Sequence, residues 1–529
     1  MKYIQNPVLP GFNPDPSILR VGDDYYIATS TFEWFPGVQI HHSRDLVNWR
    51  LITRPLTRLS QLNMTGNPNS GGIWAPCLSY SNGIFYLVYT DVKYFREIFK
   101  ECYNYLVTTT DITGEWSDPI FLNGSGFDPS LFHDDDGRKW LVNMVWDHRK
   151  NKNQFSGILL QEYSEKEKKL VGNIKNIFKG SELALVEGPH LYKRGGYYYL
   201  MTAEGGTGLK HAVTVARSRN IDGPYELDPE NPMLTSALDP TLELQRAGHA
   251  SLVETQNGEW YIAHLCSRPI PSVGRSTMGR ETSIQKVMWT EDGWLRLECG
   301  GNKPQAKVVA PDLPECKCTS VPERDDFDGE ELDINFQTLR LPITDDLLSL
   351  KERPGYLRLK GWGSLSSFNK QALVARRQQA FRYEASTCME YDPVTFQNMA
   401  GLICYYNTKN FYYLHMTHDD ESGNYLDVMT CQAGVFDYPL DDRIIVNETK
   451  KIWLKACVDY DRLVFYYSLD GTNWSAIKTV FDASTLSDEF EMAGAHGHFT
   501  GAFVGLCCQD LSGQKRHADF DYFEYMEVT

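Results

Sequence analysis

Residues 12–30 read FNPDPSILRVGDDYYIATS, a short strand, a glycine-containing polar turn and a second strand rich in tyrosine. The same pattern recurs as IWAPCLSYSNGIFYLVYTD (73–91), FDPSLFHDDDGRKWLVNMVW (127–146), EGPHLYKRGGYYYLMTAEG (187–205) and GHASLVETQNGEWYIAHLC (248–266). The aligned aromatic residues are Tyr26, Tyr86, Trp140, Tyr199 and Tyr261. They recur about every 60 residues, the length of a four-stranded blade with its loops. Five copies predict a five-bladed β-propeller, with a β-sandwich of coincidental spacing as the alternative.

The composition changes after the fifth copy and indicates a second domain. Residues 306–324 are rich in Pro, Lys and Cys, which is typical of an extended linker. Later segments such as AGLICYYNTKNFYYLHMT (400–417) and KIWLKACVDYDRLVFYYSLDG (451–471) have strand character and almost no helical periodicity. We therefore place an all-β propeller at 1–305, a linker at 306–324 and an antiparallel β-sandwich at 325–529.

The charge excludes several kinds of partner. A net charge of −17 and a pI near 5.3 argue against nucleic acid and anionic membranes, which require clustered Lys and Arg. The first residues, MKYIQNPVLP, lack the apolar core of a signal peptide, so we expect a cytoplasmic protein. The 12 cysteines lie mostly in apolar strand-like runs and are expected to be free thiols. The close pair Cys316 and Cys318 has no second pair at zinc-site spacing.

The starts of the five repeats predict a functional site. In a propeller the innermost strand of every blade begins near the central axis, so these starts converge. The converging residues are Asp15, Ala75, Asp128, Glu187 and His249. Carboxyl groups brought together push their pKa values apart, which provides an acid and a base at one pH. Each residue alone has an ordinary alternative, since Asp before Pro often starts a turn.

Four motifs carry a resemblance to a known family. They are FNPDPS at 12–17, FDPS at 127–130, VEGPH at 186–190 and GRET at 279–282. In identity and spacing they resemble family 43 glycoside hydrolases, and in layout the chain resembles the two-domain β-xylosidase branch. The resemblance spans the whole chain. It implies a catalytic propeller followed by a β-sandwich, and chemistry that requires no cofactor.

The resemblance also implies catalytic roles. Asp15 would be the general base that activates water, and Glu187 the general acid that protonates the leaving oxygen. Asp128 would orient Glu187 and keep its pKa raised. Such a pair hydrolyses with inversion when base and acid stand about 6.5–9.5 Å apart, because a water fits between the base and the sugar.

Substrate-binding residues follow from the same resemblance. Arg280 would hold sugar hydroxyls, and His249 would lie beneath the sugar and bind a cation or water, with a structural role as its alternative. A set of residues would line a pocket for one terminal sugar. These residues are Phe32, Trp74, Trp146 and the small Ala75. A closed pocket admits only a chain end, so exo action is expected.

The sandwich is expected to contribute to the pocket and to bind metal. GHFTGAFVGLCCQD resembles a segment that supplies a phenylalanine to the site, here Phe503, with Phe499 as the other candidate. Asp328 and Asp521 lie in acidic turns whose oxygen atoms suit a structural calcium ion.

Together these features predict an exo-acting, inverting enzyme that releases xylose from β-1,4-xylo-oligosaccharides, with α-L-arabinofuranosidase side activity. The alternatives are an arabinan-degrading enzyme, either an arabinofuranosidase or an endo-arabinanase, and a non-catalytic glycan-binding protein. The expected partner is a xylo-oligosaccharide, with no nucleic acid and no membrane. We expect a homo-oligomer, either a dimer or a tetramer.

Overall fold

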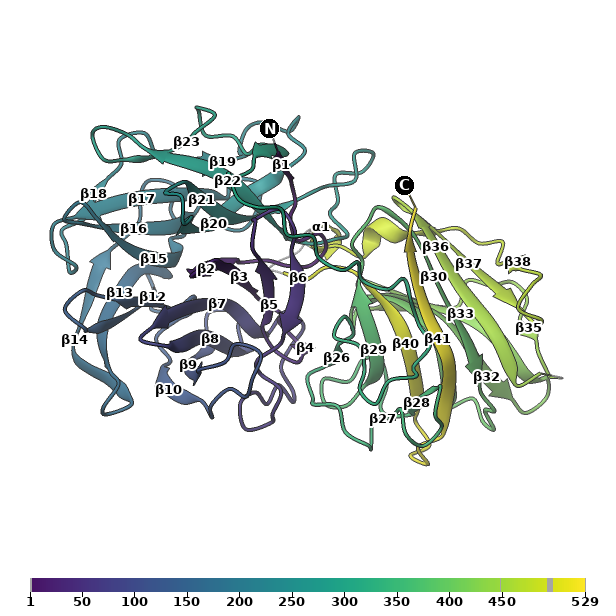
Figure 1. The fold of residues 1–529 in the computed structure, drawn as a ribbon. Helices are drawn as coiled ribbons and strands as arrows, with labels where there is room; N and C mark the ends of the chain where they lie inside the picture. Colours follow the sequence, from purple (N-terminus) through teal and green to yellow (C-terminus); the bar gives the residue numbers. More distant parts are fainter. Residues whose placement is uncertain (1, 448, 492–497, 529) are drawn as a thin grey trace. The chain divides into compact units, whose positions relative to one another are not determined.

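The computed structural model describes residues 2–447, 449–491 and 498–528. Regular structure in them is almost entirely β, apart from a 3₁₀ turn, η1 (Ala483–Thr485), and α1 (Asp488–Glu491). None of these described residues forms a helix long and apolar enough to span a membrane. The all-β fold class is thus confirmed (Figure 1).

The chain forms two compact units. The first comprises residues 1–33, 37–268 and 280–319. The second comprises residues 34–36, 269–279 and 320–529.

Five antiparallel sheets make up the first unit, and each follows the previous one in the chain (Figure 1, purple to teal). The first two consist of β2 (Ser17–Val21), β3 (Asp24–Thr29), β5 (Gln39–Ser43) and β6 (Arg50–Thr53), then β7 (Gly72–Ser81), β8 (Ile84–Tyr94), β9 (Glu101–Thr109) and β10 (Ile120–Asn123). The third consists of β11 (Ser130–His133), β12 (Lys139–Trp146), β13 (Phe155–Ser164) and β14 (Lys169–Phe178). The fourth consists of β15 (Glu187–Arg194), β16 (Tyr197–Glu204), β17 (Ala212–Ser218), β18 (Glu226–Leu227) and β19 (Leu234–Thr235). The fifth consists of β20 (Gln245–Glu254), β21 (Trp260–Ser267), β22 (Glu281–Trp289) and β23 (Leu295–Leu297). This arrangement confirms the five-bladed propeller.

Each repeat quoted above is the inner hairpin of one blade. The tight turn between its strands uses glycine, for example Gly22 with φ 63° and Gly83 with φ 82°. Such values favour glycine because it has no Cβ, which is why the turn is visible in the sequence.

The ring of blades is closed by the first residues of the chain. Leu9 and Thr282 exchange backbone hydrogen bonds, and Gly11 N donates to the Glu281 carboxylate at 2.9 Å. Because Thr282 and Glu281 belong to β22, the chain start is fixed to the fifth blade. In addition, β1 (Tyr3–Gln5) pairs with β24 (Lys307–Val309).

Two large antiparallel sheets form most of the second unit. One contains β25 (Arg324–Asp325), β27 (Leu348–Ser349), β28 (Leu357–Lys360), β30 (Arg382–Glu390), β36 (Lys451–Asp459), β37 (Arg462–Ser468), β38 (Ser475–Ala476), β39 (Phe481–Asp482) and β41 (His517–Glu527). The other contains β29 (Ala372–Arg377), β31 (Asn398–Asn407), β32 (Asn410–Asp419), β33 (Gly423–Gln432), β34 (Val435–Asp437), β35 (Ile444–Ile445) and β40 (Phe503–Asp510). A small ladder pairs β26 (Thr338–Leu339) with β4 (Trp34–Phe35).

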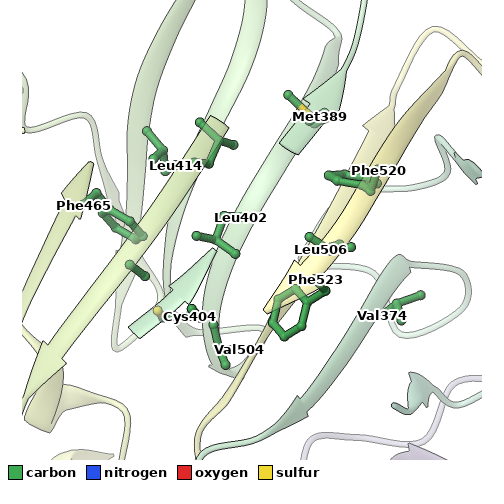
Figure 2. Packing of buried hydrophobic residues seen from close by; sticks show 14 of the residues in the cluster. Val374, Met389, Leu402, Cys404, Leu414, Phe465, Val504, Leu506, Phe520 and Phe523 are labelled. Atoms are coloured by element: carbon green, nitrogen blue, oxygen red, sulfur yellow. The ribbon is translucent and has the colours of Figure 1, made fainter. Parts of the chain in front are cut away.

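The core of the second unit lies between these two sheets. Leu402 and Leu506 from one sheet and Phe465 and Phe520 from the other are fully buried in a single cluster (Figure 2). Along β36 buried and half-buried residues alternate, as expected for a strand with one face on a core. The predicted antiparallel sandwich is confirmed.

The segment expected to be a linker is partly ordered into the propeller. β24 lies inside 306–324, and the first unit continues to residue 319. The pairing with β1 explains the difference, because sequence composition does not reveal a partner strand about 300 residues away.

Candidate active site

In four of the five blades a residue near the start of the inner strand has a left-handed backbone. Asp15, Asp128, Gly188 and His249 have φ values of 56°, 55°, 57° and 48°. This left-handed conformation costs about 1–2 kcal/mol in a residue with a side chain, and such strain gathers at functional sites. The fourth blade therefore differs from the predicted register. Gly188 takes the left-handed position, and Glu187 lies one residue before it.

Asp15 is surrounded by groups that favour its ionised form. Its Oδ1 accepts a hydrogen bond from Arg280 Nη1 at 2.9 Å, and its Oδ2 accepts one from Ser30 Oγ at 2.7 Å. His249 Nδ1 lies 3.6 Å from Oδ1. Burial by itself raises the pKa of Asp15, but Arg280, His249 and Ser30 outweigh it and the pKa falls below its usual value. A carboxylate held ionised in this way can act as a base.

Glu187 has the opposite shift. Burial, and then the negative charge of Asp15, raise the pKa of Glu187 to about 8, although Arg280 and Lys100 act against the rise. Glu187 therefore carries its proton at neutral pH, as a general acid must. The two carboxyls are thus separated into a base and an acid by their surroundings.

Asp128 is joined to the peptide that follows the acid. Its Oδ2 accepts a hydrogen bond from Gly188 N at 3.0 Å. Burial, with the charges of Glu187 and Asp15, raises its pKa well above the usual value. Asp128 thus contacts the backbone beside Glu187, which suits the orienting role. The first causes of the raised pKa of Glu187 are burial and Asp15 rather than Asp128.

Aromatic rings form a continuous wall beside these acids. The ring centroid of Trp74 lies 6.2 Å from that of Phe32 and 5.0 Å from that of Phe127. Lys100 Nζ lies 4.3 Å from the ring centroid of Trp146 and 5.7 Å from that of Trp74. The guanidinium carbon Cζ of Arg280 lies 5.4 Å from the ring centroid of Phe32. The structure thus brings Phe32, Trp74, Trp146 and Arg280 together.

Ala75 and His249 complete the converging set. Both are buried, at 5% exposure. A Cβ on Gly188 would lie only 2.9 Å from His249 Nε2. The imidazole therefore packs closely against the backbone of Gly188, the residue that follows Glu187. Burial lowers the pKa of His249, although the charge of Asp15 acts against the fall.

A ring of neutral residues follows on the inner strands, two positions after Asp15, Ala75, Asp128, Gly188 and His249. Its members are Ser17, Cys77, Ser130, His190 and Ser251. Ser251 Oγ donates to Pro16 O at 2.8 Å and accepts from Ile18 N at 2.8 Å, which ties the fifth blade to the first. Burial lowers the pKa of His190 to about 3, so the ring adds no charge. These five residues and later residues of the same strands line a cavity of about 470 Å³.

Two further residues join the site without a signal in the sequence. Thr207 Oγ1 lies 3.4 Å from Arg280 Nη1. Lys100 donates to Phe95 O at 3.1 Å, and burial lowers its pKa. Both lie outside the five repeats, so the repeat pattern could not reveal them. Phe127 could have been identified from the sequence, because it directly precedes Asp128 in the FDPS motif.

Phe503 lies within the second unit. Its side chain is fully buried, and its ring stacks on Trp34 with 3.7 Å between centroids. The guanidinium of Arg377 lies 5.1 Å from its centroid. Phe499 is half-buried. A contribution of either phenylalanine to the sugar pocket stays a prediction.

The calcium prediction concerns two aspartates of the second unit. Asp521 Oδ2 accepts a hydrogen bond from Lys451 Nζ at 3.2 Å, so a cationic side chain already neighbours it. Within the described ranges no three His, Cys, Asp or Glu side chains are grouped to hold a metal ion, whereas calcium takes about 6–8 oxygen ligands. Calcium binding by Asp328 and Asp521 stays a prediction.

The two opposite pKa shifts predict the pH dependence of activity. For a β-xyloside that needs protonation, kcat/KM should be high while Asp15 is ionised and Glu187 protonated. It should fall as the pH rises through about 8, the raised pKa of Glu187, and on the acidic side only below the usual range for Asp. A pH series of initial rates measures both limbs. Loss of activity already above about pH 5 would contradict the acid role, since an unperturbed Glu ionises near there.

Comparison with known proteins shows the family of both units. The family model described as Glycosyl hydrolases family 43 matches residues 4–295, and one described as Beta xylosidase C-terminal Concanavalin A-like domain matches residues 324–526. A protein named Beta-xylosidase from Bacillus subtilis (strain 168) is 53% identical over 534 residues, covering 99% of both chains.

Two further relatives extend the comparison. Xylosidase/arabinosidase 43B from Humicola insolens is 52% identical, covering 100% of this chain and 98% of the relative. The crystal structure of a xylan beta-1,4-xylosidase from Bacillus halodurans C-125 matches with a TM-score of 0.97 and 58% identity, covering 99% of this chain and 100% of that one. The family model over more than half of the sequence and these relatives show that the chain belongs to glycosyl hydrolase family 43.

Proposed function

We propose that the protein is an exo-acting β-xylosidase that releases xylose from the non-reducing ends of β-1,4-xylo-oligosaccharides with inversion. The observation that carries the proposal is the pair of opposite pKa shifts at one site, lowered for Asp15 and raised to about 8 for Glu187. An ionised base and a protonated acid are what a single displacement by water requires. The names of the two most similar relatives above support xylose as the sugar.

The residues act in one concerted step. Asp15 takes a proton from a water as that water attacks the anomeric carbon, and Glu187 gives its proton to the leaving oxygen. Arg280 holds Asp15 in place and keeps it ionised, and Asp128 holds the backbone at Gly188. The aromatic wall of Phe32, Trp74 and Trp146 packs against the sugar ring.

Side activity on α-L-arabinofuranosides is part of the proposal, because the Humicola insolens relative is named Xylosidase/arabinosidase. An arabinan-degrading enzyme would use the same acid and base, and it differs in substrate preference. Comparing kcat/KM for the 4-nitrophenyl β-xyloside and α-L-arabinofuranoside separates the two functions. A higher value for the arabinofuranoside would replace the first assignment by the second.

Product analysis tests the exo and inverting parts together. From xylohexaose we expect only xylose and xylopentaose in early samples, because a pocket for one sugar admits only the chain end. Proton NMR in the first minutes should show α-xylose, since one attack from the opposite face inverts the anomeric centre. Early xylobiose and xylotriose would instead show an open cleft, and early β-xylose would show a covalent intermediate.

The cytoplasmic location and the homo-oligomeric state are further parts of the proposal. The acidic composition is consistent with a freely diffusing enzyme of imported short oligosaccharides. Cell fractionation tests the location, and light scattering of the purified protein at several concentrations tests for a dimer or a tetramer.

A further inference from the structure

The segment that leads into the catalytic acid is fixed at both ends. Glu204 is fully buried, and its Oε2 accepts hydrogen bonds from Ser181 N at 2.9 Å and Ser181 Oγ at 2.7 Å. Gly205 N donates to Ala184 O at 2.8 Å. Because Glu204 and Gly205 lie at the end of β16, residues 181–186 are held against the inner hairpin that carries Glu187.

Two consecutive residues of this segment have a strained backbone. Ala184 has a φ of 61° and Leu185 a φ of 55°. Residues with side chains rarely adopt this conformation, and two in succession persist only where the surrounding contacts enforce them. Leu185 is 38% exposed, and it lies two residues before Glu187, which is half-buried. An exposed leucine in an enforced conformation calls for an explanation.

Leu185 joins two segments that border the site. A Cβ on Gly206 would lie 2.9 Å from Leu185 Cδ1, so the leucine packs directly on that glycine. The next residue, Thr207, lies 3.4 Å from Arg280 Nη1 through its hydroxyl. Leu185 thus spans from the segment of the acid to the turn beside Arg280. Since Glu187 protonates the leaving oxygen, the group attached to that oxygen lies on the same side of the site.

We propose that Leu185 binds the leaving group and sets which leaving groups the enzyme accepts. Its exposed methyl groups provide an apolar surface for the sugar or aryl ring beyond the scissile bond. A xylopyranose ring has no hydroxymethyl group, and its C–H faces pack well on an aliphatic side chain. This inference rests on the proposed function, because it takes Glu187 as the acid.

Comparing kcat/KM on two substrates distinguishes a contact between Leu185 and the leaving group from other roles of this residue. Xylobiose carries a full sugar beyond the scissile bond, whereas β-xylosyl fluoride carries a single atom there. Leu185→Ala should lower kcat/KM for xylobiose by about fivefold to tenfold, the scale expected from losing part of the burial of one leucine. The value for the fluoride should stay within about twofold of wild type, since the fluoride cannot contact the leucine.

Two further variants serve as controls. Leu185→Met keeps an apolar side chain and should retain most of the xylobiose activity. Leu227→Ala removes a leucine with the same exposed fraction, 38%, from the outer strand β18 of the same blade, and should match wild type on both substrates. Thermal unfolding of all variants confirms that they are folded.

Three results would overturn the inference. In the first, Leu185→Ala has the same kcat/KM as Leu227→Ala on both substrates. In the second, kcat/KM of Leu185→Ala falls equally on both substrates. In the third, kcat/KM of Leu185→Met on xylobiose falls as much as that of Leu185→Ala. An equal loss on both substrates would make Leu185 a positioning residue for Glu187. Failure of the proposed function itself would look different, because the wild-type protein would then hydrolyse neither substrate.

Discussion

Glu187→Gln is expected to lower kcat/KM for xylobiose by about 10³- to 10⁴-fold, because the leaving sugar then departs without its proton. On an aryl xyloside with a strongly acidic phenol the loss is less than about tenfold, since that leaving group needs little protonation. The decline of activity above about pH 8 also disappears, because the group that titrates there is gone. Initial rates on the two substrates across a pH series measure all three effects.

The matched control for this variant is Glu182→Gln. Glu182 is exposed and lies five residues before Glu187 on the same segment. The Glu182→Gln variant therefore removes a carboxylate that is not among the residues converging on the propeller axis. It should behave as wild type on both substrates. Equal losses of Glu187→Gln on xylobiose and on the activated xyloside would remove Glu187 from the acid role.

Asp15→Asn is expected to lower kcat on every xyloside by about 10³-fold or more, whatever the leaving group, because the attacking water loses its base. The amide also loses the charge that pairs with Arg280 at 2.9 Å, so substrate binding changes together with turnover. Separate measurement of kcat and KM on xylobiose and on the activated aryl xyloside shows whether the loss is uniform.

Asp24→Asn provides the comparison for Asp15. Asp24 lies in the same blade and pairs with Arg44 at 2.8 Å, but it begins β3 at the hairpin turn, opposite Val21 at the far end of the inner strand β2. Its loss should leave kcat unchanged. If activity of Asp15→Asn returned with an acidic leaving group, Asp15 would be the acid, and the two roles would be reversed.

The repeat explains why the fold could be predicted. Each copy places a glycine turn and an aromatic strand at a fixed spacing, and a propeller requires the same local structure in every blade. The same regularity indicated that Asp15, Asp128 and His249 would converge, because equivalent positions of the blades meet at the axis. The register predicted from the repeat was wrong by one residue at Glu187. There Gly188 has the left-handed conformation that aspartate has in two other blades.

The boundary between the two units was harder to predict from composition. Residues 306–319 have a linker-like composition, yet they belong to the first unit, and residues 34–36 and 269–279 belong to the second. Strand partners distant in the chain decide such membership, as with β24 and β1 or β26 and β4. Local composition contains no information on these partners.

The sequence alone determined that the protein has five blades and a sandwich, and that three acids meet near one axis, because these follow from periodic patterns. The family resemblance implied which acid keeps its proton, but only the tertiary structure gives the physical reason. The pKa of Asp15 depends on Arg280, which is distant in sequence, and that of Glu187 on burial and on Asp15. Thr207, Lys100 and Leu185 likewise became visible only through folding, because each acts through contacts with residues from other segments rather than through a motif.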